Sequence, residues 1–278
     1  MNQVTVASIF GVMKSVKQEV DINLLRHIIL NNISAIKNKN NCKFSDIILC
    51  YDGKNSWRNE EFEHYKAKRK DKTEKEQEIW NGIYKNLNTI REELKPYFHV
   101  LHVDGAEADD VIAIMTKINN TSPVTIISSD KDFLQLQSYG KNIKQYSLTT
   151  KKYITSVDSE KEIHEFIMKG DAIDGIPNVL SPEDFFVSEA PDKKRQKSIT
   201  KKVLADSYDK LQSGDIESEP YFDRYDKNRS LIDFSFIPEE VEIRIIENIN
   251  TLEDSKKGII DYCTEHGLVN ILKSLNGA

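Results

Sequence analysis

The chain has 278 residues, of which 38% are hydrophobic and 30% charged, and a net charge of −6. This length suits one large domain or two modest ones. No run approaches the roughly 18 apolar residues of a membrane helix, and the N-terminus lacks a signal-peptide pattern. Cys42, Cys50 and Cys263 lack CxxC spacing, which argues against a disulfide framework or a zinc site. We therefore expect a cytoplasmic protein with no membrane partner.

Helices and strands are expected to alternate through the first half of the chain. Asp21 can cap a helix over residues 22–37, and a strand follows over 46–51. Residues 53–75 are polar and basic, which is typical of a long functional insertion. The next expected elements are a helix ending near Leu94, a strand at 98–103, a helix at 107–119 and a strand at 124–128. This alternation predicts the α/β class, with a mainly parallel sheet flanked by helices.

The pattern changes after the strand at 124–128. The expected elements are a short helix containing Leu134 and Leu136, an edge hairpin at 143–146 and 152–155, and a helix ending near Lys169. Ser159 and Glu162 have the spacing of a capping box for that last helix. Because the remainder is mainly helical, we expect two domains, residues 1–160 and 161–278.

Acidic residues follow several of these elements. Asp130 and Asp132 come directly after the strand at 124–128, where open α/β sheets place their active sites. Two ionised carboxylates this close repel each other unless a cation lies between them. Further acids occur at other expected junctions, namely Asp52, Glu107, Asp109, Asp110, Asp171 and Asp174.

Each acidic group alone has an ordinary structural explanation, as a cap, a turn or a favourable charge in the first turn of a helix. If the helix includes residues 107–110, the side chains of Glu107 and Asp110 lie on the same face of it. The side chain of Asp109 then points in another direction, unless the helix begins only after Asp109. Taken jointly, the acids are hard to explain as caps and turns. Oxygen ligands without nearby His or Cys favour Mg²⁺ or Mn²⁺ over zinc. Two such ions could support phosphodiester hydrolysis without a Ser or Cys nucleophile.

Basic residues gather in two runs, at 64–70 and at 193–202. Either run alone could be a solvated charged face. Beside a cluster of carboxylates, phosphate binding is the better explanation, because the distribution of charge matters more than its sum.

Four motifs in one order carry a family resemblance: Tyr51-Asp52 with Trp57-Arg58, Tyr65-Lys66 and Arg69; Glu107-Ala108-Asp109-Asp110; Ser129-Asp130-Lys131-Asp132-Phe133; and Gly170-Asp171-Ala172-Ile173-Asp174-Gly175-Ile176-Pro177. The chain resembles the 5′-nuclease (flap endonuclease) superfamily over about residues 1–240. Within it, the likeness is greatest to the branch of T-even-type phage ribonucleases H.

The resemblance implies a PIN-like nuclease domain, followed by a helix-three-turn-helix (H3TH) element at residues 161–185 that grips duplex phosphates. Residues 53–75 would form an arch around a 5′ single strand. Asp52, Glu107, Asp110 and Asp130 would serve one Mg²⁺ ion, and Asp132, Asp171 and Asp174 a second, with Mn²⁺ as a substitute and Asp109 as an extra acid. Lys66 and Arg69 would clamp the scissile phosphate with help from Arg58.

The resemblance also implies contacts to nucleic acid from a wider set of residues: Arg58, Lys66, Lys68, Arg69, Lys70, Lys169, Gly170, Gly175, Lys193, Lys194, Arg195 and Lys197. The implied activity is that of a 5′→3′ exonuclease and flap endonuclease with ribonuclease H activity. It would remove RNA primers and flaps during phage DNA replication. The implied partners of this monomer are DNA, RNA–DNA hybrids, a single-strand-binding protein and a sliding clamp.

One part of the family pattern is not found. The family carries its first metal carboxylate at the end of an N-terminal strand, whereas this chain opens with Met1–Ser8, which resembles the segment after that acid. We therefore expect the first strand and its Asp to be missing and catalysis to be crippled.

Three functions stay open at this point: an active nuclease that has lost its start, a non-catalytic nucleic-acid-binding relative, and a HAD-type phosphatase. The last is disfavoured because Leu134 stands where that class has Thr or Val.

Overall fold

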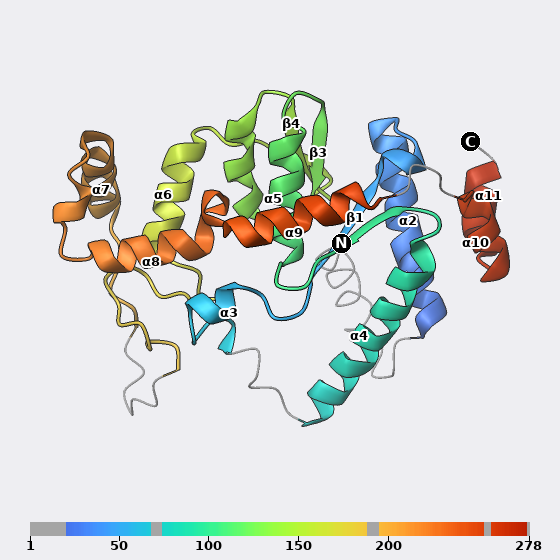
Figure 1. Ribbon diagram of the computed structural model, residues 1–278, viewed down its shortest axis with the longest axis horizontal. Coiled ribbons are helices and arrows are strands. Elements are labelled where there is room, and N and C mark those ends of the chain that lie inside the picture. Colours follow the sequence, from blue (N-terminus) through green and yellow to red (C-terminus); the bar gives the residue numbers. More distant parts are fainter. Residues whose placement is uncertain (1–20, 68–73, 188–194, 253–256, 277–278) are drawn as a thin grey trace.

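The computed structural model describes residues 21–67, 74–187, 195–252 and 257–276. The expected loss of a first strand concerns the start of the chain and lies outside these residues, as do Lys68, Arg69, Lys70, Lys193 and Lys194. Helices surround a small set of short strands, and the long α4 (Glu74–Leu94) extends obliquely from the body (Figure 1).

The strands form two separate sheets within the described residues. Strand β1 (Ile48–Tyr51) pairs in parallel with β2 (His99–His102), with Ile48 opposite His99. Strand β3 (Val124–Ile127) pairs in parallel with β4 (Ile143–Ser147), and β5 (Lys152–Ile154) adds an antiparallel edge. The predicted parallel pairing and the predicted edge hairpin are therefore both present.

One hydrophobic cluster joins the two ends of the described chain. Helix α2 (Ile22–Asn40) and α4 pack on β1 and β2, and the C-terminal helices α10 (Ile259–Glu265) and α11 (Val269–Asn276) complete the same cluster. Figure 1 shows α10 and α11 beside α2, far from α7. Glu93 of α4 reinforces this packing, because it accepts hydrogen bonds from Arg26 of α2 (2.5 and 2.9 Å) and Tyr262 of α10 (2.8 Å).

A second cluster lies behind the candidate site. Helix α5 (Ala108–Ile118), the 3₁₀ helix η3 (Lys131–Tyr139) and α9 (Glu239–Asn250) contribute to it, together with residues of β2 and β3. Phe133 and Leu136 of η3 are buried here at 1% and 0% exposure. The chain that follows β3 is thereby fixed against α5, which holds the two groups of acids on a common rigid base.

A third cluster consists of α6 (Ser159–Lys169), α7 (Lys201–Ser213), η4 (Ile216–Ser218) and α8 (Phe222–Ile232). Phe62 and Tyr65 also belong to it. They follow α3 (Arg58–Glu61), a four-residue helix. The base of the predicted arch is therefore packed against the C-terminal helices.

Several local predictions need correction. The N-cap of α6 is Asp158, whose side chain accepts from the N–H of Lys161, whereas the sequence favoured Ser159. Within residues 161–185 the structure has the rest of α6 followed only by turns, and α7 begins at Lys201. The second helix of the expected H3TH element is thus absent from that range, where Gly and Pro interrupt helical periodicity.

Candidate active site

The carboxyl ends of β1 and β3 each deliver an Asp. Asp52 directly follows β1, and its Oδ1 accepts a hydrogen bond of 2.9 Å from the N–H of Ala108, at the start of α5. Asp130 caps η3 after β3 and accepts from the N–H of Asp132. Both acids are therefore positioned by backbone groups at helix N-termini, where negative charge is favoured.

Two further carboxyls experience the charge of these acids. Burial raises the pKa of Asp109 to about 7, and the charges of Asp52, Asp130 and Glu107 add to the shift. Burial likewise raises the pKa of Asp132 to about 9, with the charge of Asp130 as the next cause. The contributions of neighbouring charges show that these acids lie close enough together to repel one another.

The loop after α6 adds the last acids. Asp171 Oδ1 accepts from the N–H groups of Ile173 (2.7 Å) and Asp174 (3.3 Å). Burial raises the pKa of Asp171, and the charges of Asp174 and Asp130 contribute. These interactions bring the predicted acids together into one group, here called the open acid cluster: Asp52, Glu107, Asp109, Asp130, Asp132, Asp171 and Asp174.

Gly170 and Gly175 have a backbone role at this loop. A Cβ at Gly170 would meet Ile176 O at 2.4 Å, and one at Gly175 would meet His64 O at 2.8 Å. Both residues have positive φ, 64° and 78°, a region that glycine adopts without strain. Gly170 therefore allows the acidic loop to pack on its own carbonyls at Ile176 and Pro177, and Gly175 allows the loop to pack against His64 at the base of the arch.

Tyr65 and Lys66 connect that arch base to the open acid cluster. The Tyr65 hydroxyl lies 2.8 Å from Glu107 Oε2 and 3.0 Å from Asp174 Oδ2. Lys66 Nζ lies 2.5 Å from Glu107 Oε1 and 3.6 Å from Asp174 Oδ2. Its backbone has φ 54° and donates to Asp174 O at 2.8 Å. A cation therefore already faces two of the acids, and Tyr65 is a site residue to which the sequence reasoning assigned no role.

Asp110 corrects the sequence interpretation. Helix α5 starts at Ala108 with Glu107 as its N-cap, so Asp110 turns back and accepts from the Glu107 N–H at 2.9 Å. It is 0% exposed and contacts Arg58 Nη1 at 2.8 Å. Asp109, by contrast, faces the other acids. Because the side chain of Asp110 folds back onto the Glu107 N–H, Asp109 and not Asp110 lies with the other acids.

Arg58 was expected at the nucleic-acid surface, but it is 3% exposed. Its guanidinium contacts Asp110 and donates from Nε to Leu231 O at 2.8 Å. Burial lowers its pKa, but the charges of Asp110 and Glu107, the Tyr65 side chain and the hydrogen bond to Asp110 together outweigh burial and hold the pKa above the usual range. Arg58, Asp110 and the Trp57 indole, which donates to Asp110 Oδ2 at 3.2 Å, are here called the buried anchor.

Gln145 supports the turn after β3 and was not found from the sequence. It is fully buried on β4, and its Nε2 donates to Ser128 O (3.0 Å) and Asp130 O (2.5 Å). Its only sequence signal is a polar residue inside a predicted strand.

The expected basic residues Lys169, Arg195 and Lys197 are exposed, and Lys169 pairs with Glu165 at 2.6 Å.

The donor set fits a divalent cation in chemistry. It consists of carboxylate oxygens, the ligands that Mg²⁺ prefers, and the raised pKa values of Asp109 and Asp132 indicate unbalanced negative charge. In the described part of the chain, however, no three His, Cys, Asp or Glu side chains are arranged so that they could hold one ion.

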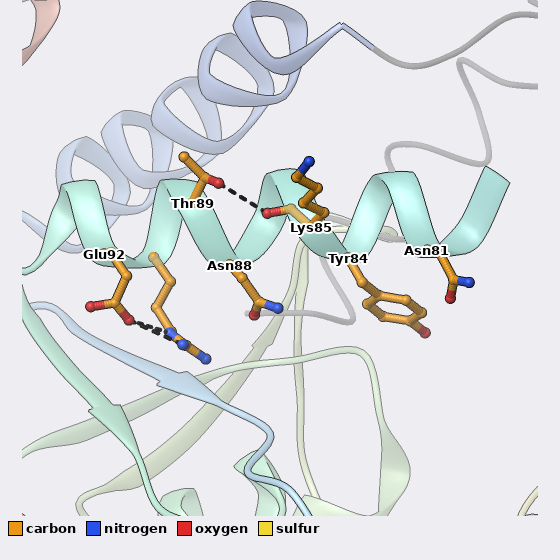
Figure 2. A pocket seen from close by; sticks show the side chains of 7 residues that line it. Asn81, Tyr84, Lys85, Asn88, Thr89 and Glu92 are labelled. Carbon is orange, nitrogen blue, oxygen red and sulfur yellow. Dashed lines mark hydrogen bonds and ion pairs between the residues drawn. The ribbon is translucent and has the colours of Figure 1, made fainter. Parts of the chain in front are cut away.

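A separate hollow of about 530 Å³ runs along α4 (Figure 2). Asn81, Tyr84 and Asn88 line it, and Thr89 donates to Lys85 O within the helix. None of the acids of the open acid cluster lines this hollow.

Comparison with protein families gives two matches along the chain. Residues 9–166 match the model described as 5′-3′ exonuclease, N-terminal resolvase-like domain. Residues 157–278 match the model described as T4 RNase H, C terminal. The chain belongs to the 5′-3′ exonuclease family. This places it among hydrolases that act on phosphodiester bonds and confirms the expected α/β fold with a helical C-terminal region.

Individual relatives agree with this membership. The chain is 32% identical to ribonuclease H of Enterobacteria phage T4 over 270 residues, which cover 94% of this chain and 88% of the relative. The D15 protein of phage T5, co-crystallised with metal ions, is similar in structure, with a TM-score of 0.61, 20% identity, and coverage of 80% of this chain and 91% of that one.

A second structure of phage T5 D15 flap endonuclease, in complex with DNA and metal ions, has a TM-score of 0.57 and 19% identity, with coverage of 80% and 89%. At these identities the two structures support the fold alone. Within the described residues, no helix is long and apolar enough to span a membrane.

Proposed function

We propose that this family member is a metal-dependent, structure-specific 5′ nuclease. It would act as a 5′→3′ exonuclease and flap endonuclease, cleave RNA in RNA–DNA hybrids, and remove RNA primers and flaps during phage DNA replication. The observation that carries the proposal is the open acid cluster, in which acids from several elements face one another beside Lys66.

The chain's own residues have distinct roles in this proposal. Asp52, Asp109 and Asp130 would hold one Mg²⁺ ion together with Glu107, and Asp132, Asp171 and Asp174 would surround a second, with Mn²⁺ as a substitute. When bound, the ions supply an activated water and stabilise charge on the phosphate oxygens. Lys66 would exchange its contact with Glu107 for the scissile phosphate, because metal binding neutralises that carboxylate.

The exposed basic residues Arg195 and Lys197 would grip duplex phosphates without reading base sequence. The relative from phage T4 is a ribonuclease H and the structural neighbour from phage T5 is a flap endonuclease, which supports hybrids and flaps as substrates. In the same proposal, the protein is a monomer that acts in the host cytoplasm. Its proposed partners are a single-strand-binding protein and a sliding clamp.

A labelled 5′ flap, a nicked duplex and an RNA–DNA hybrid, each incubated with Mg²⁺ and with EDTA, test the proposal. Cleavage that requires Mg²⁺ or Mn²⁺ is the expected result. Undiminished cleavage in EDTA would refute the metal mechanism.

A second candidate function is nucleic-acid binding without turnover. It would need only the exposed basic residues Arg195 and Lys197, which can contact phosphates without a metal ion. The same substrates decide between the two, because this candidate predicts salt-sensitive binding with no products at any Mg²⁺ or Mn²⁺ concentration.

A further inference from the structure

We propose that Arg58 and Asp110 form a positioning pair that fixes Glu107 and Asp109 for catalysis without contacting metal or nucleic acid. This inference rests on the proposed nuclease function and assigns residues that support the same site. Both side chains are almost completely buried, at 3% and 0% exposure.

The Asp110 carboxylate contacts two buried side chains and one backbone N–H. Arg58 Nη1 lies 2.8 Å from its Oδ1 and 3.0 Å from its Oδ2. Oδ2 also accepts from Trp57 Nε1 at 3.2 Å and from the Glu107 N–H at 2.9 Å. A buried carboxylate that accepts from this many donors is held in one orientation.

Arg58 joins three elements through one rigid group. It belongs to α3, contacts Asp110 of α5, and donates from Nε to the carbonyl of Leu231 in the last turn of α8. The planar guanidinium satisfies both partners at once, which a lysine ammonium at the same position would not reproduce. A cation at the C-terminus of α8 is also favoured by the helix dipole.

The N-terminus of α5 transmits this constraint to the open acid cluster. Asp110 fixes the backbone of Glu107, whose side chain contacts Tyr65 and Lys66. Asp109 follows two residues later, and the Ala108 N–H between them donates to Asp52. Loosening the pair would therefore move several acids together, and small displacements of reacting groups cost about 10²-fold in rate.

The test compares Asp110→Asn and Arg58→Lys with Asp109→Asn and with a control, Asp226→Asn, which alters a half-exposed carboxylate paired with Arg229 on α8. Three quantities are measured for each full-length variant: kcat and KM on a 5′ flap, the Mn²⁺ dissociation constant from water-proton relaxation, and the melting curve. Assays run well below the melting temperature of every variant.

The expected result for Asp110→Asn and Arg58→Lys is a fall in kcat of about 10–100-fold with KM within about twofold and weakened but measurable Mn²⁺ binding. Asp109→Asn should lose most Mn²⁺ binding. Wild-type kcat and Mn²⁺ affinity in both pair variants, with only a lower melting temperature, would show a purely structural pair and overturn the proposal.

Two other outcomes are equally informative. Loss of Mn²⁺ binding in Asp110→Asn as complete as in Asp109→Asn would make Asp110 a direct ligand and overturn the proposal. If the wild-type protein binds Mn²⁺ but cleaves no substrate, the proposed function fails, while the Mn²⁺ affinities of the four variants still test the positioning pair.

Discussion

Asp109 and Asp110 are neighbours in sequence but belong to two regions of opposite character. Asp109 is part of the open acid cluster, where burial and neighbouring negative charges raise its pKa to about 7. Asp110 is part of the buried anchor, where its Oδ2 accepts from Arg58, Trp57 and a backbone N–H and its Oδ1 lies 2.8 Å from Arg58 Nη1. Unbalanced charge suits a site that must accept cations, whereas balanced and buried charge suits a support that must not move.

The largest expected effect comes from a substitution in the open acid cluster, which should change activity strongly and stability little. Asp109→Asn should lower kcat on a 5′ flap by about 10²–10⁴-fold, the range that corresponds to several kcal/mol of metal-assisted stabilisation. Because the change also removes repulsion, the metal-free melting temperature should stay the same or rise. Kinetics and calorimetry on one preparation check both, and a clear loss of melting temperature would contradict the description of this region as open.

The next effect concerns the cation that faces the open acid cluster. Lys66→Ala should lower kcat by about 10²-fold with a small change in duplex affinity, because Lys66 would stabilise charge that develops in the transition state. Single-turnover cleavage and equilibrium binding measure the two quantities. Equal losses in both would instead make Lys66 part of a general electrostatic surface.

The buried hydrogen bonds of His164, in the C-terminal helices, allow a comparison through the pH dependence of stability. His164 is 1% exposed, with Nδ1 3.0 Å from Tyr225 Oη and Nε2 2.8 Å from Ser207 Oγ, and burial lowers its pKa to about 4. In the unfolded chain the pKa of a histidine is about 6.5. Between pH 4 and pH 6.5 the unfolded state therefore binds more protons at His164 than the folded state does. The free energy of unfolding should therefore fall as pH drops from 6.5 to 4, by no more than about 3 kcal/mol from this residue.

Urea unfolding across this pH range measures the effect. His164→Gln should flatten the dependence, while His27→Gln, at a partly exposed histidine, serves as the matched control. An unchanged pH dependence in His164→Gln would show that other groups cause the loss of stability.

The smallest effect concerns the exposed basic residues near α7. Arg195→Ala and Lys197→Ala should each weaken duplex binding a few-fold and reduce the slope of log affinity against log salt by about 0.9, one phosphate contact each. Titrations at several salt concentrations measure the slope. Slopes identical to that of the wild-type protein would exclude these side chains from the nucleic-acid interface.

Much of the fold follows from local sequence pattern. Apolar patterns predicted α2 and the strands β1 to β5 within a few residues, because these elements bury apolar side chains. Pro96 predicted the end of α4 at Leu94. The same reasoning placed α5 within one residue but did not decide which of the first-turn acids Asp109 and Asp110 would lie with the other acids, since both are compatible with several caps. It also missed Asp158 as the cap of α6.

The sequence alone determined which side chains were available: the acids after β1 and β3, the acidic loop at 170–177, and the Tyr65-Lys66 pair. Only the tertiary structure decided which of them face one another. Arg58 and Leu231 are 173 positions apart in the chain, and Gln145 reaches Asp130 across a strand pair. Such contacts depend on how whole elements pack, and local periodicity carries no information about the partner that a buried polar group finds.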